Sequence, residues 1–118
     1  MSASDAGDAA AAAARAQRVR ARLEAAYEDP ERQVFLPTLD LSESGVFLLS
    51  TQAPAVGSHA QVVLELPGHE AFLRLRGAVT RVQLEPVAGF ALRFENDAPN
   101  AEALDALREF VRREGRSG

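Results

Sequence analysis

The side chains best suited to chemistry form one short polar cluster, Asp40-Leu41-Ser42-Glu43-Ser44-Gly45, which runs directly into an apolar stretch. A carboxylate and a hydroxyl two positions apart can hydrogen-bond the edge of a purine, and Gly45 would leave backbone space for a flat ring. The same residues also suit a turn that Asp40 and Ser42 cap, with Gly45 at a positive φ angle. The spacing alone leaves both interpretations open.

Residues for metal or nucleophilic chemistry are scarce. The chain contains no cysteine, which excludes a thiolate zinc site and a cysteine nucleophile. Its two histidines, His59 and His69, lie on either side of a Pro-Gly turn, and Ser42 lacks the glycine pattern that surrounds the nucleophile of a serine hydrolase. We therefore expect no metal, no cofactor and no enzymatic activity.

The basic residues are the other candidates for ligand contacts. All thirteen are arginine, in a chain of 118 residues with a formal charge of -4. This composition fits either a bias toward GC-rich codons or selection for the guanidinium fork, which pairs with phosphate and carboxylate groups. The acidic balance argues against a nucleic-acid polymer as the partner.

The elements that must position these residues begin after the amino-terminal arm. Residues 1–17 carry mostly small or acidic side chains, so we expect them to be disordered or loosely helical, ahead of one domain over 18–115. Alternation of apolar and polar residues favours a strand over about 20–27. The same side chains also fall on one helical stripe, so residues 9–26 could be helix or strand.

A series of short extended segments follows. Asp29-Pro30-Glu31 is a turn signal, and the stretch after it, 33–41, completes a hairpin. Turn residues separate four further segments rich in β-branched residues, and a slip of the apolar phase predicts a bulge near Gly77 or Arg81. Together these segments predict a six-stranded antiparallel β-barrel, the four later strands lying at 46–50, 60–66, 71–82 and 89–95.

The chain ends in a predicted helix over 100–114. Asn100 is a favourable N-cap, Glu102 falls in the first turn, and Leu104, Leu107 and Phe110 form an apolar stripe at helical spacing. Arg112, Arg113 and Gly115 are typical of a helix end. We expect this helix to cover one mouth of the barrel.

The order of these features resembles that of the PilZ domain family. Its Asp-x-Ser-x-x-Gly element matches Asp40, Ser42 and Gly45, and a strand follows in both cases. The segment 54–58 before a strand, Gly77-x-Val79 in the next strand, 89–94 in the last strand and the closing helix complete the likeness. The resemblance implies a β-barrel with a carboxy-terminal helix, which in many members binds the bacterial second messenger cyclic di-GMP.

The arginine element of that family has two possible matches. Ligand-binding PilZ domains carry Arg-x-x-x-Arg just before the first strand, where two guanidiniums hold the phosphates and stack on guanine. The literal match is Arg18 with Arg22, whereas a first strand that ends at Tyr27 puts Arg18 second, with Arg15 one residue away from the first position. The implied ligand-binding residues are thus Arg15, Arg18, Arg22, Asp40, Ser42 and Gly45.

By this resemblance the chain is a cytoplasmic receptor or adaptor in bacterial cyclic di-GMP signalling, acting on a protein effector of motility or signalling. We expect no membrane insertion, because no stretch approaches the roughly 18 apolar residues of a membrane span. The alternative is a PilZ-like module that does not bind the nucleotide and acts as a protein-protein interaction adaptor in motility, secretion or signalling. The register of the arginines separates the two.

Overall fold

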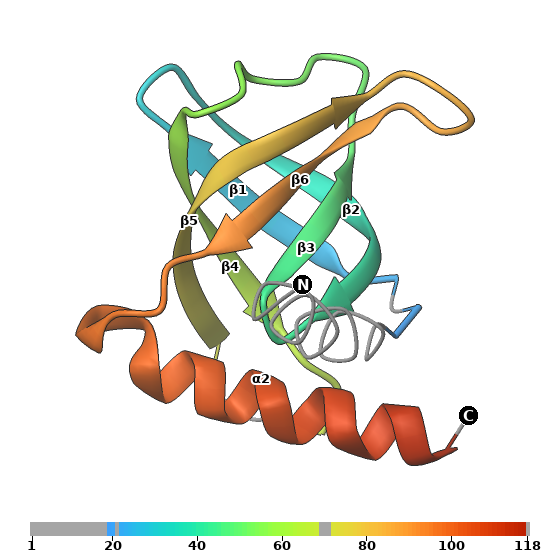
Figure 1. The fold of residues 1–118 in the computed structure, drawn as a ribbon, viewed down its shortest axis with the longest axis vertical. Helices are drawn as coiled ribbons and strands as arrows, with labels where there is room; N and C mark the ends of the chain where they lie inside the picture. Colours follow the sequence, from blue (N-terminus) through green and yellow to red (C-terminus); the bar gives the residue numbers. More distant parts are fainter. Residues whose placement is uncertain (1–18, 21, 69–71, 118) are drawn as a thin grey trace, which may run out of the picture.

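The computed structural model describes residues 19–20, 22–68 and 72–117 of the chain. Six antiparallel strands close into a barrel in the order β1-β2-β3-β6-β5-β4, and one helix, α2, lies across one end of it (Figure 1). This architecture confirms the predicted barrel and closing helix. The strands are β1 (Glu24–Asp29), β2 (Arg32–Ser42), β3 (Gly45–Leu49), β4 (His59–Glu65), β5 (Phe72–Gln83) and β6 (Gly89–Phe94).

The first strand begins later than the sequence predicts. A strand was expected over about 20–27, but β1 starts at Glu24, after Arg22 and Leu23, which lie outside any strand. Only an isolated bridge at Val19 precedes it among the described residues. The predicted disorder or loose helix of residues 1–17 lies outside the described residues, and so does most of the stretch that could be helix or strand.

Alternation along each strand fills the barrel. Inward side chains of all six strands join one apolar cluster, in which the rings of Tyr27 and Phe90 meet edge to face with centroids 5.4 Å apart. A small barrel of this kind is a packed core because its interior is only wide enough for side chains. Completely buried members include Leu41, Leu48, Val62, Leu64 and Leu75.

Two register shifts bend the barrel wall. One lies between Val79 and Arg81 in β5, which confirms the predicted bulge at the second of its two candidate positions. The other lies between Thr38 and Asp40 in β2, where no slip of the apolar phase predicts it. The β2 shift comes immediately before the polar cluster, and bulges re-aim the side chains that follow them.

The helix α2 (Ala98–Ser117) is longer than predicted at both ends. Leu104, Leu107 and Phe110 are buried against the barrel, as their spacing indicates. The predicted N-cap is wrong, because Asn100 lies inside the first turn, and that turn holds no acidic residue. The predicted end is also wrong, since the helix continues past Gly115.

Asn100 joins the helix to the barrel instead of capping it. Its buried side-chain amide accepts a hydrogen bond from the Arg76 backbone N–H at 3.1 Å and donates to the Arg76 carbonyl at 2.9 Å and the Glu95 carbonyl at 2.6 Å. These bonds satisfy backbone groups at the end of β6 and in β5. The local N-cap preference is therefore overridden by a tertiary contact.

The turn between β1 and β2 is tightly bonded. Asp29 accepts hydrogen bonds from the backbone N–H groups of Glu31 at 2.8 Å and Arg32 at 3.0 Å, and from the Tyr27 hydroxyl at 2.6 Å. The Arg32 guanidinium also lies 5.3 Å from the centre of the Tyr27 ring. These contacts fix the turn at the end of the barrel away from α2 (Figure 1).

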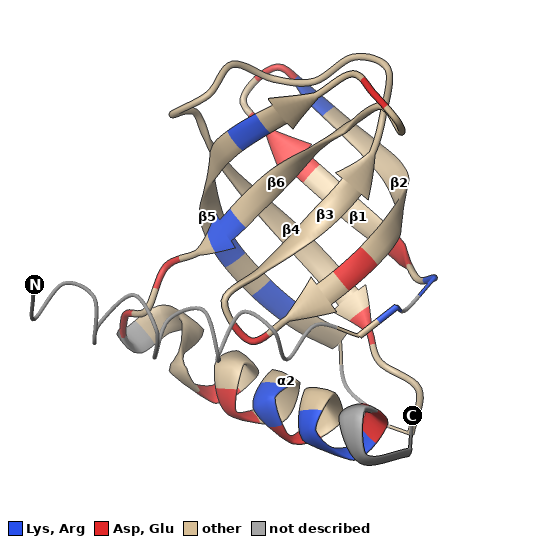
Figure 2. Cartoon of the chain, turned by 45° about the vertical axis from the view of Figure 1, so that its right-hand side comes forward, with Lys and Arg blue, Asp and Glu red and all other residues tan. Residues whose placement is uncertain are grey.

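Charged residues are spread over the molecule. Acidic and basic segments both occur on the strands of the barrel and along α2 (Figure 2). Among the described residues, no helix is long and apolar enough to cross a membrane, and no group of three or more His, Asp or Glu side chains is arranged to hold a metal ion.

Candidate functional site

The polar cluster lies at the turn between β2 and β3, where Ser42 caps the backbone. The Ser42 Oγ accepts hydrogen bonds from the N–H groups of Ser44 and Gly45, both at 3.2 Å, and lies 3.1 Å from the Ser44 Oγ. The Ser42 side chain is completely buried. In this structure, therefore, its oxygen holds the turn, as one of the two sequence-based interpretations proposes.

Gly45 is required by close strand packing. Its backbone does not adopt the positive φ angle that the turn interpretation predicts; among the described glycines, that conformation occurs at Gly57 and Gly68. A Cβ atom at Gly45 would instead lie 2.5 Å from the Leu92 carbonyl oxygen of β6. Because this oxygen belongs to a paired strand, a larger residue at position 45 would push β3 and β6 apart.

Asp40 lies two residues before the capping serine on the outer surface of the barrel. It is half-buried and pairs in register with Phe47 of β3. Phe47 also points outward, yet only 2% of it is exposed, and the Arg81 guanidinium of β5 lies 5.7 Å from the centre of its ring. Asp40 thus places a carboxylate on the outer surface of the barrel, two residues before the serine that closes the turn.

The segment before β1 runs alongside this part of β2. Val19 and Leu41 exchange two backbone hydrogen bonds, of 2.9 and 3.0 Å. Further along, Leu23 accepts a bond from the Thr38 N–H at 2.8 Å, and its own N–H donates to the Thr38 Oγ1 at 2.9 Å. These two anchor points lie on either side of Asp40, so the described residues between them, Arg20 and Arg22, lie beside the motif.

Two described arginines lie between the anchors at Val19 and Leu23. Arg20 and Arg22 are both exposed, and neither makes a hydrogen bond or ion pair with another described residue. Of the predicted arginine element, the structure thus places Arg22 on the segment that runs beside Asp40. Arg15 and Arg18 lie outside the described residues, and the two possible registers stay predictions.

Sequence reasoning missed two residues that position the site. Thr38 is completely buried and receives the Leu23 N–H; its only signal was a lone hydroxyl in a mainly apolar strand. Arg108 of α2 donates from its Nε to the Glu43 Oε1 at 3.4 Å, which ties the motif turn to the helix. Such a contact across 65 positions leaves no local pattern in the sequence.

The profile of the PilZ domain family matches residues 13–113. The chain belongs to the PilZ domain family. PilZ domains act as receptors and adaptors, and the family is not known for enzymes. No curated protein matches the chain.

Solved PilZ structures share the fold. The Bacillus subtilis inhibitor of motility MotI/DgrA superposes with a TM-score of 0.72 at 18% identity, covering 85% of this chain and 50% of that one. This chain therefore spans about half the length of MotI/DgrA. The PilZ domain of CeSA from a cellulose-synthesizing bacterium gives 0.61 at 15% identity, with 80% and 97% covered. A tetrameric PilZ protein of Xanthomonas campestris gives 0.53 at 26% identity, with 76% and 49% covered.

Proposed function

We propose that this PilZ domain is a bacterial receptor for cyclic di-GMP, which binds between the amino-terminal arm and the outer surface around Asp40 and thereby controls contact with a protein effector. The observation that carries the proposal is the pair of backbone anchors at Val19 and Leu23. They hold two arginines without partners among the described residues beside the Asp-x-Ser-x-x-Gly motif. The family membership supports the same ligand.

The chemistry of the ligand fits the side chains gathered there. Cyclic di-GMP carries two phosphate groups and two guanines. A guanidinium fork pairs with phosphate and stacks on a purine, and Arg22 together with Arg18, or with Arg15, supplies such forks. A carboxylate such as Asp40 accepts hydrogen bonds from two adjacent N–H groups at a guanine edge.

Ser42 and Gly45 take supporting roles in this proposal. The Ser42 oxygen is engaged with two turn amides, and the Gly45 backbone packs against β6. Both residues therefore act by fixing the turn that follows Asp40. This division of roles makes Asp40 and the arginines the residues whose loss should affect binding most.

Calorimetric titration with cyclic di-GMP tests the arginines. Changing Arg18 and Arg22 together to Ala should weaken binding by about 3 to 6 kcal/mol, at roughly 1.5 to 3 kcal/mol for each charge-assisted contact. Binding to the unchanged protein should also weaken as the salt concentration rises from about 0.05 to about 0.5 M. Arg74→Ala is the matched control, because Arg74 is an exposed arginine of β5, a strand that pairs with neither β1 nor β2.

A second variant, Asp40→Asn, tests the carboxylate. The amide keeps the size of the side chain but presents an N–H group to a guanine N–H, so affinity should fall. Urea denaturation of the same variant separates a loss of binding from a loss of stability. Unchanged affinity in both variants would contradict the proposed site. If the folded wild type binds no cyclic di-GMP at millimolar concentration and low salt, the alternative is favoured, an adaptor that works without the nucleotide.

A further inference from the structure

One side of the barrel wall carries exposed aromatic side chains. The face formed by β2, β1, β4 and β5 has Phe35 at 69% exposure on one side and Phe72 at 66% on the other. A row of side chains outside the barrel begins at Phe35 and crosses the adjacent strands in register, through Ala26 and Val63 to Arg74. A hollow of about 400 Å³ beside Phe35 is lined by this row. We refer to this surface as the β1–β4–β5 face.

The charges on this face divide into paired and unpaired groups. Arg76 contacts Asp97 at 3.1 Å and Glu95 at 3.8 Å, and His59 lies 3.5 Å from the same Glu95. The amides of Gln33 and Gln61 donate to the two oxygens of Glu28. These contacts form two bonded groups, one around Glu95 and one around Glu28.

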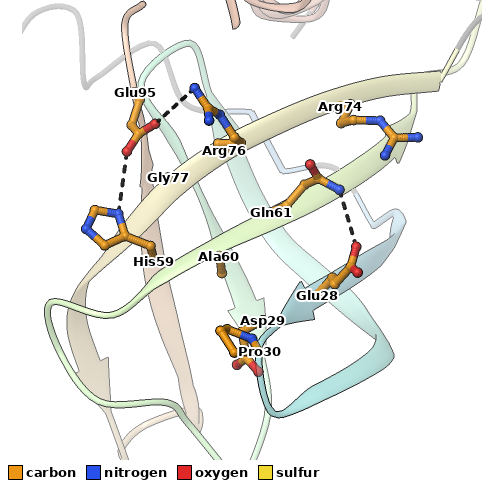
Figure 3. A pocket seen from close by; sticks show the side chains of 10 residues that line it. All are labelled: Glu28, Asp29, Pro30, His59, Ala60, Gln61, Arg74, Arg76, Gly77 and Glu95. Atoms are coloured by element: carbon orange, nitrogen blue, oxygen red, sulfur yellow. Dashed lines mark hydrogen bonds and ion pairs between the residues drawn. The ribbon is translucent and has the colours of Figure 1, made fainter. Parts of the chain in front are cut away.

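Arg74 stands outside both groups. Figure 3 shows Arg74 with no marked contact, whereas Arg76 and His59 converge on Glu95. Arg74 also makes no hydrogen bond or ion pair with any other described residue. The same holds among the described residues for two exposed acids of this face, Glu24 and Glu65. Glu24 lies beside Pro37, and Glu65 pairs in register with Phe72.

We propose that the β1–β4–β5 face is a docking surface for a second copy of this chain, in a two-fold dimer. A two-fold contact brings a patch against itself, so a patch must carry both members of every ion pair it makes. This face does so, because Arg74 of one copy meets Glu24 or Glu65 of the other, and symmetry makes the pair twice. Ala26 and Val63 in the middle of the face, with the exposed Phe35 and Phe72 rings on either side of them, supply the apolar surface that such interfaces require.

The closed barrel constrains how a second copy can dock. All six strands have two neighbours, so the described sheet has no free edge that could extend into a partner. Association must therefore rest on outward side chains. Phe35 and Glu24 of this face lie on β2 and at the start of β1, whereas Arg74 lies on β5, which pairs with neither of those strands, so Arg74 is the residue that separates this proposal from nucleotide binding.

A charge exchange tests the two-fold pairing. Sedimentation equilibrium of the full chain, without nucleotide, should show a dimer that forms between about 1 µM and about 1 mM. Arg74→Glu alone, and the double variant Glu24→Arg with Glu65→Arg alone, should each associate at least about tenfold more weakly, because like charges then face each other. An equimolar mixture of the two variants should form heterodimers, since both symmetric contacts are restored.

Heterodimer formation also shows that both variants are folded, and circular dichroism checks each one separately. Arg93→Glu is the matched control, an exposed arginine of β6 outside this face, and it should dimerise as the wild type does. A monomeric wild type at about 1 mM, an Arg74→Glu variant that dimerises normally, or a mixture that associates no better than its components would each overturn the proposal. Cyclic di-GMP affinity should be the same for Arg74→Glu and wild type, which separates this test from that of the proposed function.

Discussion

The two ends of β2 carry turns of the same design with different chemistry. At one end, an Asp29 oxygen accepts the backbone N–H groups two and three residues later, at 2.8 and 3.0 Å. At the other end, the Ser42 hydroxyl accepts the equivalent two groups, both at 3.2 Å. One cap is a charged carboxylate with a third bond from a tyrosine, and the other is a neutral hydroxyl.

Because different side chains close the two turns, we assign different roles to Asp29 and Asp40. Asp29 is needed by its own turn, whereas the turn at the motif is closed by Ser42, two residues after Asp40. A carboxylate that forms a turn is committed to the fold. For the Asp40 carboxylate, on the outer surface of the barrel before the second turn, we propose contact with a ligand.

Asp29→Ala should have the largest effect on stability. It removes the acceptor of three hydrogen bonds and leaves the buried Tyr27 hydroxyl without its partner, so the free energy of unfolding should fall by about 2 to 4 kcal/mol. Urea denaturation measures the change. Glu31→Ala in the same turn is the control and should have little effect, because in the described structure the turn uses its backbone N–H. A loss no larger than that of Ser42→Ala would remove the contrast between the two turns.

Tyr27→Phe should sharpen the contrast through its pH dependence. The Tyr27 hydroxyl, with the backbone bonds from Glu31 and Arg32, holds the pKa of Asp29 below its ordinary value of 3.8. A lowered pKa stabilises the fold above the unfolded value, and the stabilisation is lost as pH falls through the folded value. The variant should therefore be less stable than wild type at about pH 7, by about 1.5 to 3 kcal/mol, and the difference should shrink toward about pH 2.

Urea denaturation across that pH range, with the Asp29 carboxyl followed by NMR, checks both statements. The phenyl ring preserves the edge contact with Phe90, so the variant isolates the hydroxyl. A stability difference that stays constant down to about pH 2 would show that the hydroxyl does not act through the charge of Asp29.

Ser42→Ala should have the smallest effect of the three. It removes a neutral cap, so the free energy of unfolding should fall by on the order of 1 kcal/mol. If Ser42 only holds the turn, calorimetry should find cyclic di-GMP affinity nearly unchanged, whereas a direct contact with guanine predicts weaker binding with little change in melting. Thr51→Ala on an exposed loop is the control for the loss of a hydroxyl.

Sequence patterns predicted the elements better than their contacts. Period-two alternation located the strands after Asp29, and the spacing of Leu104, Leu107 and Phe110 located the buried face of the helix, because burial imposes both periods. The start of β1 was misplaced because the alternation of apolar and polar residues begins before Glu24, in the segment that precedes the strand. Asn100 was misread as an N-cap because its partners, the backbone of Arg76 and Glu95, are brought to it only by the barrel.

Only the local contacts of the candidate site could be predicted from the sequence. The spacing of Asp40, Ser42 and Gly45 indicated a turn, since side-chain caps act over two or three residues. Whether Gly45 supplies a φ angle or room for a neighbouring strand depends on Leu92, which is distant in sequence. The bonds between Leu23 and Thr38 could likewise not be predicted, because one buried threonine leaves no repeating pattern in the sequence.

The strand order also implies a sequence of events during folding. Strands β1, β2 and β3 pair in chain order, and so do β4, β5 and β6, so the barrel consists of two three-stranded meanders. They meet at two seams, β1 with β4 and β3 with β6, and the first of these has three residue pairs against seven between β4 and β5. Contacts between neighbouring strands close short loops and cost less chain entropy than the seams. Each meander can therefore form locally, and the barrel becomes a single cooperative unit only when the two seams close.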